Sequence, residues 1–457
     1  MQSPTAQALM DRLAVAPASA AELGQALGMS RTAVSRLIQP LERSGRIVRS
    51  SATRGARYGL TRGVGTVGAS WPLYRIDESG QPGQVATVHA VERDRVFVVG
   101  GPERVRGSFQ GLPYYLQDAR PGGFLGRAIP SAHPDLALPP RVVDWTDNHV
   151  LVYLTQRGSE STGNLVIGGA ALDRYLSGAQ GPRLVAQAHR AQAYVELAAA
   201  AMHGAPPGSS AHGEHPKFAV RIARDGGAVE HALVKFSPAR STPVGVRWAD
   251  LLVAEHLASS VLSEHGIPAA YSELLEYGEQ VFLQSQRFDR VGDAGRRGVT
   301  SLFSLDAALY GQLDSWLASA CRLRASALLG AEDTERLAVL DTFGALIANT
   351  DRHFGNVSLF DDYVGALRLA PTYDMLPMLF APQDGHIVER AFMPPGPTAA
   401  TLAAWPRARV LAEEYWRRLI DDGRLSEDFL GHSARALQAI RDLPARASPR
   451  APVSMPA

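Results

Sequence analysis

The segment 345–360 constrains this 457-residue chain more than any other part of the sequence. It reads A-L-I-A-N-T-D-R-H-F-G-N-V-S-L-F, which is typical of an apolar helix end, a polar loop and an apolar strand. Asp351 and Asn356 lie on the loop, and Asp374 follows 18 positions after Asn356 in L-A-P-T-Y-D. Oxygen atoms of carboxylate and amide groups are the ligands that Mg²⁺ prefers. The spacing predicts that Asn356 and Asp374 hold Mg²⁺, while Asp351 orients a hydroxyl group and accepts its proton.

Lysine is almost absent from the chain. Lysine and arginine together number 46, and only Lys217 and Lys235 are lysine, which indicates that a compact ammonium group is needed at these places. Lys235 lies in the strand pattern H-A-L-V-K-F, and the helix pattern that follows, 248–260, carries Glu255 among apolar residues. Kinases use such a strand lysine, paired with a helix glutamate, on nucleotide phosphates. Lys217 ends a loop of small residues in which Gly213 and its neighbours would let backbone N–H groups approach a phosphate.

Residues 1–62 form a basic unit with nine arginines and three acidic residues. The sequence predicts helices over 5–13, 20–27 and 31–44, with Ser19 and Glu22 as a capping box and Ser30 as an N-cap. Ile47-Val48 and 58–60 then read as a two-stranded wing. This pattern resembles winged helix-turn-helix domains, which place their second motif helix in the DNA major groove. By that resemblance the residues facing bases would be Arg31, Thr32, Ser35 and Arg36, and those facing the DNA backbone would be Arg54 and Arg57.

The middle of the chain, from about 71 to 176, carries short β-prone runs and no chemistry that stands out. The runs predicted as strands are 86–91, 95–99, 150–154 and 164–167, and a helical insertion is expected around 114–129. An alanine-rich helix is expected over 185–202.

The set G-S-S…P-K, L-V-K-F, R-F-D-R, N-T-D-R-H-x-x-N and A-P-T-Y-D resembles the HipA family of bacterial toxin kinases over about residues 72–440. The basic head resembles the YjjJ-like branch of that family. The resemblance implies a multidomain α+β fold, in which a winged helix precedes a β-rich subdomain and a two-lobed kinase-like fold with an all-helical C-lobe. The implied domains are 1–62, 72–200, the N-lobe 201–295, the C-lobe 296–443 and a disordered tail 444–457.

The same resemblance implies an activity and its residues. The activity is Mg-ATP-dependent phosphorylation of protein serine or threonine, with autophosphorylation at Ser210. His353 would lie near the phosphates, and the backbone of Gln286 and Phe288 would hold adenine. The chain departs from the family pattern at His212 and His215 in the small-residue loop and at Phe354-Gly355 in the catalytic loop, which leaves the choice of substrate open.

Other functions remain open at this point. A metal-dependent nuclease could use Asp351, His353, Asn356 and Asp374 as ligands, although the two lysines fit a kinase better. The main alternative is a DNA-binding transcriptional regulator whose kinase-like domain only senses a nucleotide or another ligand. The expected partners are ATP, Mg²⁺, DNA and an unknown protein substrate, and a homodimer would fit a winged-helix head. A single cysteine, Cys321, and the lack of a signal peptide or an apolar span favour the cytoplasm.

Overall fold

The computed structural model describes residues 4–51, 55–178, 181–203 and 215–443. The chain divides into two units, and each is assembled from separate stretches of sequence. Unit 1 comprises residues 1–181, 289–299 and 361–365, and unit 2 comprises 182–288, 300–360 and 366–457. The domain boundary expected at residue 200 falls inside unit 2, because residues 182–200 pack there.

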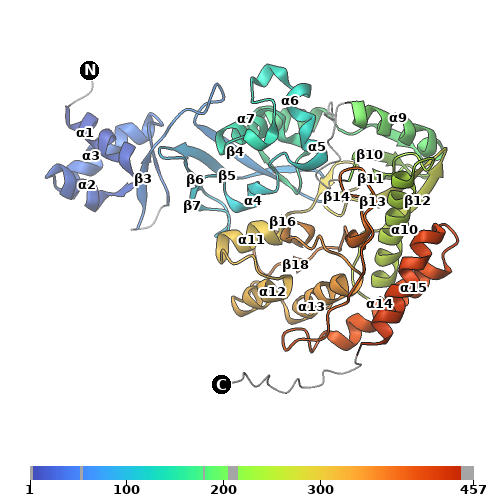
Figure 1. The fold of residues 1–457 in the computed structure, drawn as a ribbon. Helices are drawn as coiled ribbons and strands as arrows, with labels where there is room; N and C mark the ends of the chain where they lie inside the picture. The colour runs from blue at the N-terminus through green and yellow to red at the C-terminus, as the bar shows by residue number, and fades with distance from the viewer. Residues whose placement is uncertain (1–3, 52–54, 179–180, 204–214, 444–457) are drawn as a thin grey trace, which may run out of the picture. The chain divides into compact units, whose positions relative to one another are not determined.

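The head of unit 1 contains three helices and a small sheet (Figure 1). The helices are α1 (Pro4–Val15), α2 (Ala20–Leu27) and α3 (Arg31–Arg43), and the strands, in the sheet order β1-β3-β2, are β1 (Ala18–Ser19), β3 (Arg57–Leu60) and β2 (Ile47–Arg49). The capping box at α2 is confirmed, since the Ser19 N–H donates to Glu22 Oε2 at 2.6 Å. Ser30 caps α3 by accepting from the Ala33 N–H at 3.3 Å. These caps satisfy N–H groups that the helices themselves leave unpaired.

The rest of unit 1 is built on a five-stranded antiparallel sheet of order β7-β6-β5-β4-β8. Its strands are β4 (Ser70–Ile76), β5 (Pro82–Val91), β6 (Arg95–Val99), β7 (Gly107–Gln110) and β8 (Leu165–Ile167). The expected helical insertion is present as α4 (Tyr114–Gln117), α5 (Gly123–Arg127) and α6 (Ile129–Ala132), and α8 (Gly169–Ser177) follows β8. The later segment 289–299 adds β14 (Arg290–Val291) and β15 (Gly295–Arg296).

The prediction of a strand over 150–154 was wrong, because this run lies in helix α7 (Asp147–Arg157). The His149 side chain accepts from the Thr146 N–H at 3.1 Å and so stabilises the first turn. Val150, Leu151 and Leu154 are all buried in the core that covers the sheet. A short apolar run of this kind fits a buried helix as well as a strand, and here the packing decides.

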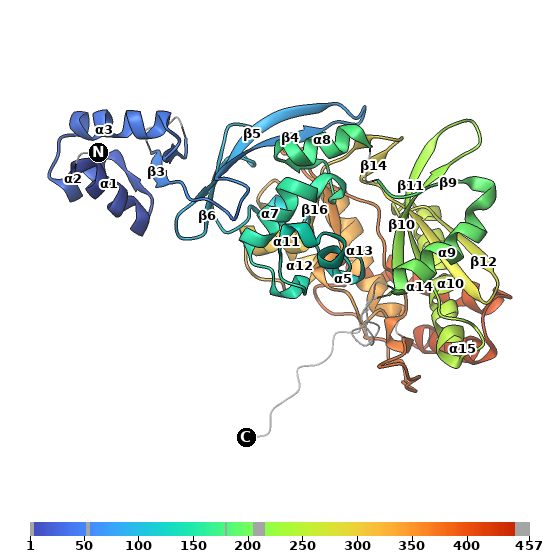
Figure 2. The same ribbon diagram turned by 90° about the horizontal axis from the view of Figure 1, so that it is seen from above.

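Unit 2 begins with a five-stranded sheet of order β12-β13-β11-β10-β9. Its strands are β9 (Leu184–Ala186), β10 (Lys217–Ala223), β11 (Val229–Phe236), β12 (Ser272–Tyr277) and β13 (Gln280–Gln286). Helix α9 (Arg190–His203) packs on one face through Tyr194, whose hydroxyl donates to Gln284 at 2.7 Å. Helix α10 (Pro243–Glu264) packs on the other face through Leu252, against Leu283 of β13 (Figure 2). The helix expected over 185–202 is therefore shorter than predicted, since its first residues form β9 parallel to β10.

The remainder of unit 2 is mainly helical, and α10 also packs against α14. The helices are α11 (Leu302–Leu309), α12 (Trp316–Ala325), α13 (Ala331–Leu346), α14 (Trp405–Asp421) and α15 (Glu427–Arg441). The expectation of an all-helical lobe was wrong in one respect, because β17 (Ser358–Phe360) and β18 (Arg368–Leu369) pair as a short antiparallel ladder. In sequence, this ladder lies between the loop that carries Asp351 and the turn that carries Asp374. No helix among the described residues is long and apolar enough to cross a membrane.

Candidate active site

Lys235 lies on the face of β11 that packs against α10. Side chains alternate along a strand, so Lys235 points away from the core that buries Val234 and Phe236. Its Nζ atom donates to both carboxylate oxygens of Glu255 on α10, at 2.7 and 2.6 Å, and also contacts Oδ1 of Asp374. The exposed fractions of Lys235 and Glu255 are only 9% and 4%. Three residues predicted from distant parts of the sequence therefore meet in one buried cluster.

Two carboxylates share one ammonium group in this cluster, and the pKa shifts follow from that. Burial alone would lower the pKa of Lys235, but Asp374 and Glu255 outweigh it and raise the pKa, so the ammonium stays charged. Burial also raises the pKa of Glu255, although Lys235 opposes the rise. For Asp374, burial is outweighed by the ammonium groups of Lys235 and Lys217, which hold its pKa well below the usual range. Asp374 is thus an ionised carboxylate at neutral pH.

Lys217 is the direct cross-strand neighbour of Lys235 in the β10–β11 pair. Opposite residues of an antiparallel pair share one face of the sheet, and like charges placed there destabilise it. His215 lies beside them, with its Nε2 atom 3.1 Å from the Phe236 carbonyl oxygen. Burial, reinforced by Lys235 and Lys217, holds the pKa of His215 well below its usual range, so this imidazole adds no third charge. The only two lysines of the chain thus lie side by side, an arrangement that favours an anionic ligand.

The loop after α13 is held by Asn349, whose exposed fraction is 1%. Its Oδ1 accepts from the Asp351 N–H at 3.0 Å, and its Nδ2 donates to the Asp374 carbonyl oxygen at 3.4 Å. The Nδ2 of Asn356 donates to the Asp351 carbonyl oxygen at 2.9 Å, which closes the loop on itself. Asp374 itself has a φ of 56°, a left-handed backbone conformation that is unusual outside glycine. Asp351, Asn356 and Asp374 are therefore positioned by one hydrogen-bonded frame.

The side chain of Asp351 reaches solvent, and its carboxylate makes no hydrogen bond to another described group. Partial loss of hydration raises the pKa of Asp351 above its usual value, with Asp374 adding to the rise and His353 opposing it. A carboxylate that is free to approach a ligand and is more basic than usual suits a general base.

The oxygen atoms of this site fit a magnesium ion. Because Nδ2 of Asn356 is committed to the Asp351 carbonyl, its Oδ1 is left without a donor among the described groups. Asp374 is ionised and only one of its oxygens contacts Lys235. A carboxylate and an amide oxygen, completed by water and phosphate oxygens, form a usual magnesium environment. Asn356 and Asp374 could therefore hold Mg²⁺.

The strand end expected to hold adenine is joined to the Asp374 turn by aromatic packing. The Phe288 ring lies 5.8 Å from the Tyr373 ring, and the Tyr373 hydroxyl donates to the Gly355 carbonyl oxygen at 2.7 Å. The N–H of Gln286, however, donates to the Tyr271 carbonyl oxygen at 2.8 Å, so this donor is already used within the protein. Any contact of Gln286 with a nucleotide base would have to use another group.

Sequence reasoning missed three residues that position this site, namely Asn349, Tyr373 and Trp316. The Trp316 indole N–H donates to the His353 carbonyl oxygen at 3.3 Å. Asn349 and Tyr373 lay within the quoted motifs, but the residues that they bond are separated from them by up to 25 positions. Of the other predicted residues, Gly213 and Ser210 lie outside the described part of the chain, as does Arg54.

The residues predicted to face DNA bases lie on one exposed side of α3. Arg31, Thr32, Ser35 and Arg36 are all exposed, while Val34 and Ile38 of the same helix are buried in the head. Arg57 is less free, because its guanidinium donates to the Pro17 carbonyl oxygen at 2.7 Å and pairs with Glu22 at 3.1 Å.

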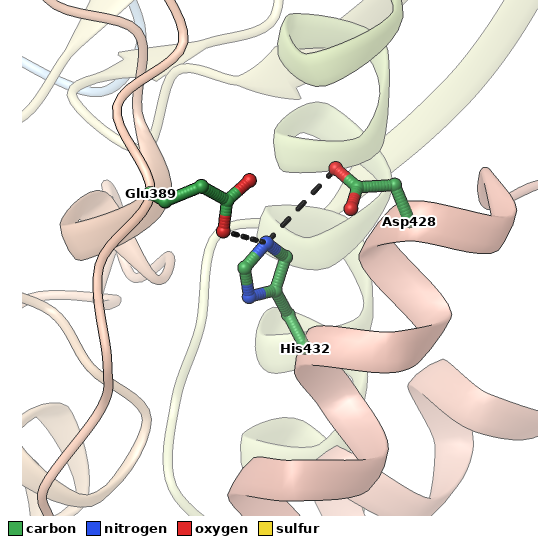
Figure 3. A group of neighbouring side chains, drawn as sticks. All are labelled: Glu389, Asp428 and His432. Carbon is green, nitrogen blue, oxygen red and sulfur yellow. Dashed lines mark ion pairs between the residues drawn. The ribbon is translucent and has the colours of Figure 1, made fainter.

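A second group of ionisable side chains lies within unit 2. Glu389, Asp428 and His432 place their oxygen and nitrogen atoms within 4.8 Å of one another (Figure 3). The buried guanidinium of Arg247 bonds Asp428 at 2.5 Å and lies 3.4 Å from His432 Nε2. Because the Arg247 guanidinium already neutralises Asp428, we interpret this group as an ion pair between α10 and α15 with polar contacts to His432 and Glu389.

Comparison with known proteins places the chain in a family. The family model described as "YjjJ-like toxin, middle domain" matches residues 67–176, and the model described as "HipA-like C-terminal domain" matches residues 209–427. Toxin YjjJ of Escherichia coli (strain K12) is 34% identical over 441 residues, which cover 95% of this chain and 97% of that protein.

The fold also has a solved counterpart. A chain in the structure of the Shewanella oneidensis MR-1 toxin–antitoxin system HipA, HipB and its operator DNA complex matches with a TM-score of 0.50. That match covers 82% of this chain and 97% of the other at 14% identity, so it concerns the fold alone. The sequence relationship is the stronger result: this chain belongs to the family of YjjJ-like toxins with a HipA-like C-terminal domain.

Proposed function

We propose that this protein is a Mg-ATP-dependent kinase that phosphorylates serine or threonine hydroxyls of proteins. The observation that carries the proposal is the buried cluster of Lys235, Glu255 and Asp374, which is tied through Asn349 to the loop of Asp351. Phosphoryl transfer depends mainly on positioning and on neutralising charge, and the cluster supplies cations and metal ligands within one frame.

Each residue then has a defined role. Lys235, oriented by Glu255, binds phosphate oxygens, and Lys217 adds positive charge on the same face of the sheet. Asn356 and Asp374 would hold Mg²⁺, which when bound would neutralise phosphate charge. Asp351 orients the acceptor hydroxyl and takes its proton as the oxygen forms a bond to phosphorus and the bond to ADP breaks.

The test of this proposal is transfer of labelled γ-phosphate from ATP to protein in the presence of Mg²⁺. Wild-type protein should become labelled, with chelation of Mg²⁺ or the change Asp374→Asn lowering the initial rate at least about tenfold. Arg141→Ala removes an exposed charge that, within the described part of the chain, pairs with Asp144 alone, and it serves as the control. If wild type binds ATP but transfers no phosphate to itself or to any peptide, the alternative role as a nucleotide sensor would be favoured.

We further propose that the head binds DNA through α3. The exposed side of α3 carries Arg31 and Arg36 beside Thr32 and Ser35, which is the kind of surface that contacts phosphates and base edges. With the full chain, Arg31→Ala and Arg36→Ala together should weaken DNA binding and reduce the slope of log affinity against log salt by about one to two. An unchanged slope in the double variant would reject this surface. Autophosphorylation at Ser210 stays a prediction of the family resemblance, and mass spectrometry after treatment with ATP would locate it.

A further inference from the structure

A cavity of about 700 Å³ opens beside Asp351 within unit 2. Asp351 and His353 lie on its polar side. Its apolar lining comes from Ala345, Ala348 and Leu379 and, from a second stretch of chain, Phe392 and Met393. A hydroxyl group that reaches Asp351 through this cavity would bring its neighbouring groups against these apolar side chains.

The second stretch of chain, 387–397, has free main-chain groups. Among the described residues, none forms a hydrogen bond to a main-chain N–H or C=O group of 387–397. Pro394, Pro395 and Pro397 lack an N–H group and restrict the backbone to extended conformations. An extended chain with unpaired N–H and C=O groups is a surface on which another extended peptide can form main-chain hydrogen bonds.

This stretch is nevertheless fixed to the helices behind it. The Phe392 ring lies 6.0 Å from the ring of Trp416, which is fully buried on α14. Before it in sequence, Glu389 Oε2 lies 3.8 Å from His432 Nε2 on α15 (Figure 3). The wall of the cavity is therefore held to α14 by the Phe392 ring, whereas the Glu389 side chain, 74% exposed, approaches α15 at the surface.

Met393 points the other way, with an exposed fraction of 86%. Leaving such a large apolar side chain in water is unfavourable, whereas methionine is a common and adaptable contact residue at peptide-binding surfaces. It lines the same cavity as Asp351, so an apolar group placed against Met393 and Phe392 would lie next to the reacting hydroxyl.

We infer that this cavity selects the protein substrate, as an extended segment that carries serine or threonine with a large apolar residue directly beside it. The inference rests on the proposed kinase activity and deepens it. The main chain of 391–395 would align the segment, and Met393 and Phe392 would contact its apolar residue. Lys217 and Lys235, which would bind phosphate, play no part in the choice of substrate.

The test uses a library of synthetic peptides, each with a central serine or threonine and varied neighbours, phosphorylated by the full-length protein. Wild type should favour a large apolar neighbour over a charged or small one by about tenfold or more in kcat/KM. Met393→Glu should reduce that preference to about threefold or less, while Met393→Leu retains it. Val410→Glu places the same charge at a position of α14 that is 59% exposed and does not line the cavity, and it should retain the preference.

The outcomes separate this inference from the proposed activity. Phosphorylation of the library with equal rates for apolar and charged neighbours would overturn the inference and leave the kinase intact. The same holds if Met393→Glu keeps the wild-type preference while its thermal unfolding is unchanged. No transfer by wild type to any peptide or to itself would instead remove the kinase, and the inference with it.

Discussion

Replacing Lys235 by methionine tests the physical basis of the buried cluster. Methionine keeps most of the volume of the side chain but removes the ammonium group that Glu255 and Asp374 share. Two carboxylates would then lie close together, and Glu255, at an exposed fraction of 4%, would keep only the longer-range attraction of Lys217. The variant should therefore fold less stably and bind nucleotide poorly.

The magnitude follows from how deeply the pair is buried. Removing one partner of a buried ion pair costs about 3–5 kcal/mol, because the other charge is left without compensation. Asp374 is less enclosed, with 27% of its side chain exposed, so most of the cost comes from Glu255. We expect a loss of about 3 kcal/mol in the free energy of unfolding of unit 2 at pH 7.5. Adding Glu255→Leu to Lys235→Met should restore most of it, since apolar groups of similar volume tolerate burial.

Denaturant unfolding of the two single variants and the double variant, at pH 7.5 and pH 5.5, measures this coupling. Without Lys235, burial keeps the pKa of Glu255 above its value in the unfolded chain. A folded state that binds the extra proton gains stability as pH falls, so the deficit of Lys235→Met should shrink between pH 7.5 and 5.5. A loss below about 1 kcal/mol, the value of an exposed ion pair, would refute the description of this cluster as buried and coupled.

Three further predictions concern other parts of the protein. Burial, with Arg247 adding to it, lowers the pKa of His432, so folding keeps this imidazole neutral and wild type should lose stability as pH falls below about 6.5. Between pH 7.5 and 5.5 the thermal unfolding temperature of His432→Gln should fall less than that of wild type, and an equal fall would contradict this reasoning. Ser30→Ala removes the cap of α3 and should destabilise the head by about 1 kcal/mol, measured by hydrogen exchange of the α3 amides, with no change there counting against the cap. Asn349→Ala removes the side-chain hydrogen bonds that join the Asp351 loop to the Asp374 turn and should cost about 1–3 kcal/mol and slow phosphate transfer, although Asn349 contacts no reacting atom; an unchanged rate would show that the frame does not position Asp351.

Much of the candidate site could be predicted from the sequence because its signals are local. Asp351 and Asn356 lie on one loop, so their spacing can be read directly from the sequence. That lysine occurs only at positions 217 and 235 can likewise be counted. The structure adds what local signals cannot contain. That the two lysines face each other depends on the register of β10 with β11, and that Lys235 meets Asp374 depends on a contact 139 residues apart in sequence.

The fold was harder to predict where packing overrides local preference. Residues 150–154 have the β-branched and aromatic composition of a strand, yet they form part of α7 because the sheet of unit 1 requires an apolar cover. Likewise, 184–186 join a sheet whose neighbouring strand begins at residue 217. Residues 289–299 and 361–365 belong to unit 1 because of contacts such as the Arg104–Asp361 ion pair, which local sequence patterns do not predict.

The proposed kinase activity requires that Asp351 promotes phosphate transfer from ATP in the site that Lys235 and Asp374 complete. The most direct measurement is the single-turnover rate of transfer from Mg-ATP to a serine peptide, for wild type and for Asp351→Asn, together with the affinity of each for ATP. Asp351→Asn should lower the rate by about 10²–10⁴ while its affinity for ATP changes less than about threefold. A rate in Asp351→Asn within a few fold of wild type would contradict the assignment of this loop.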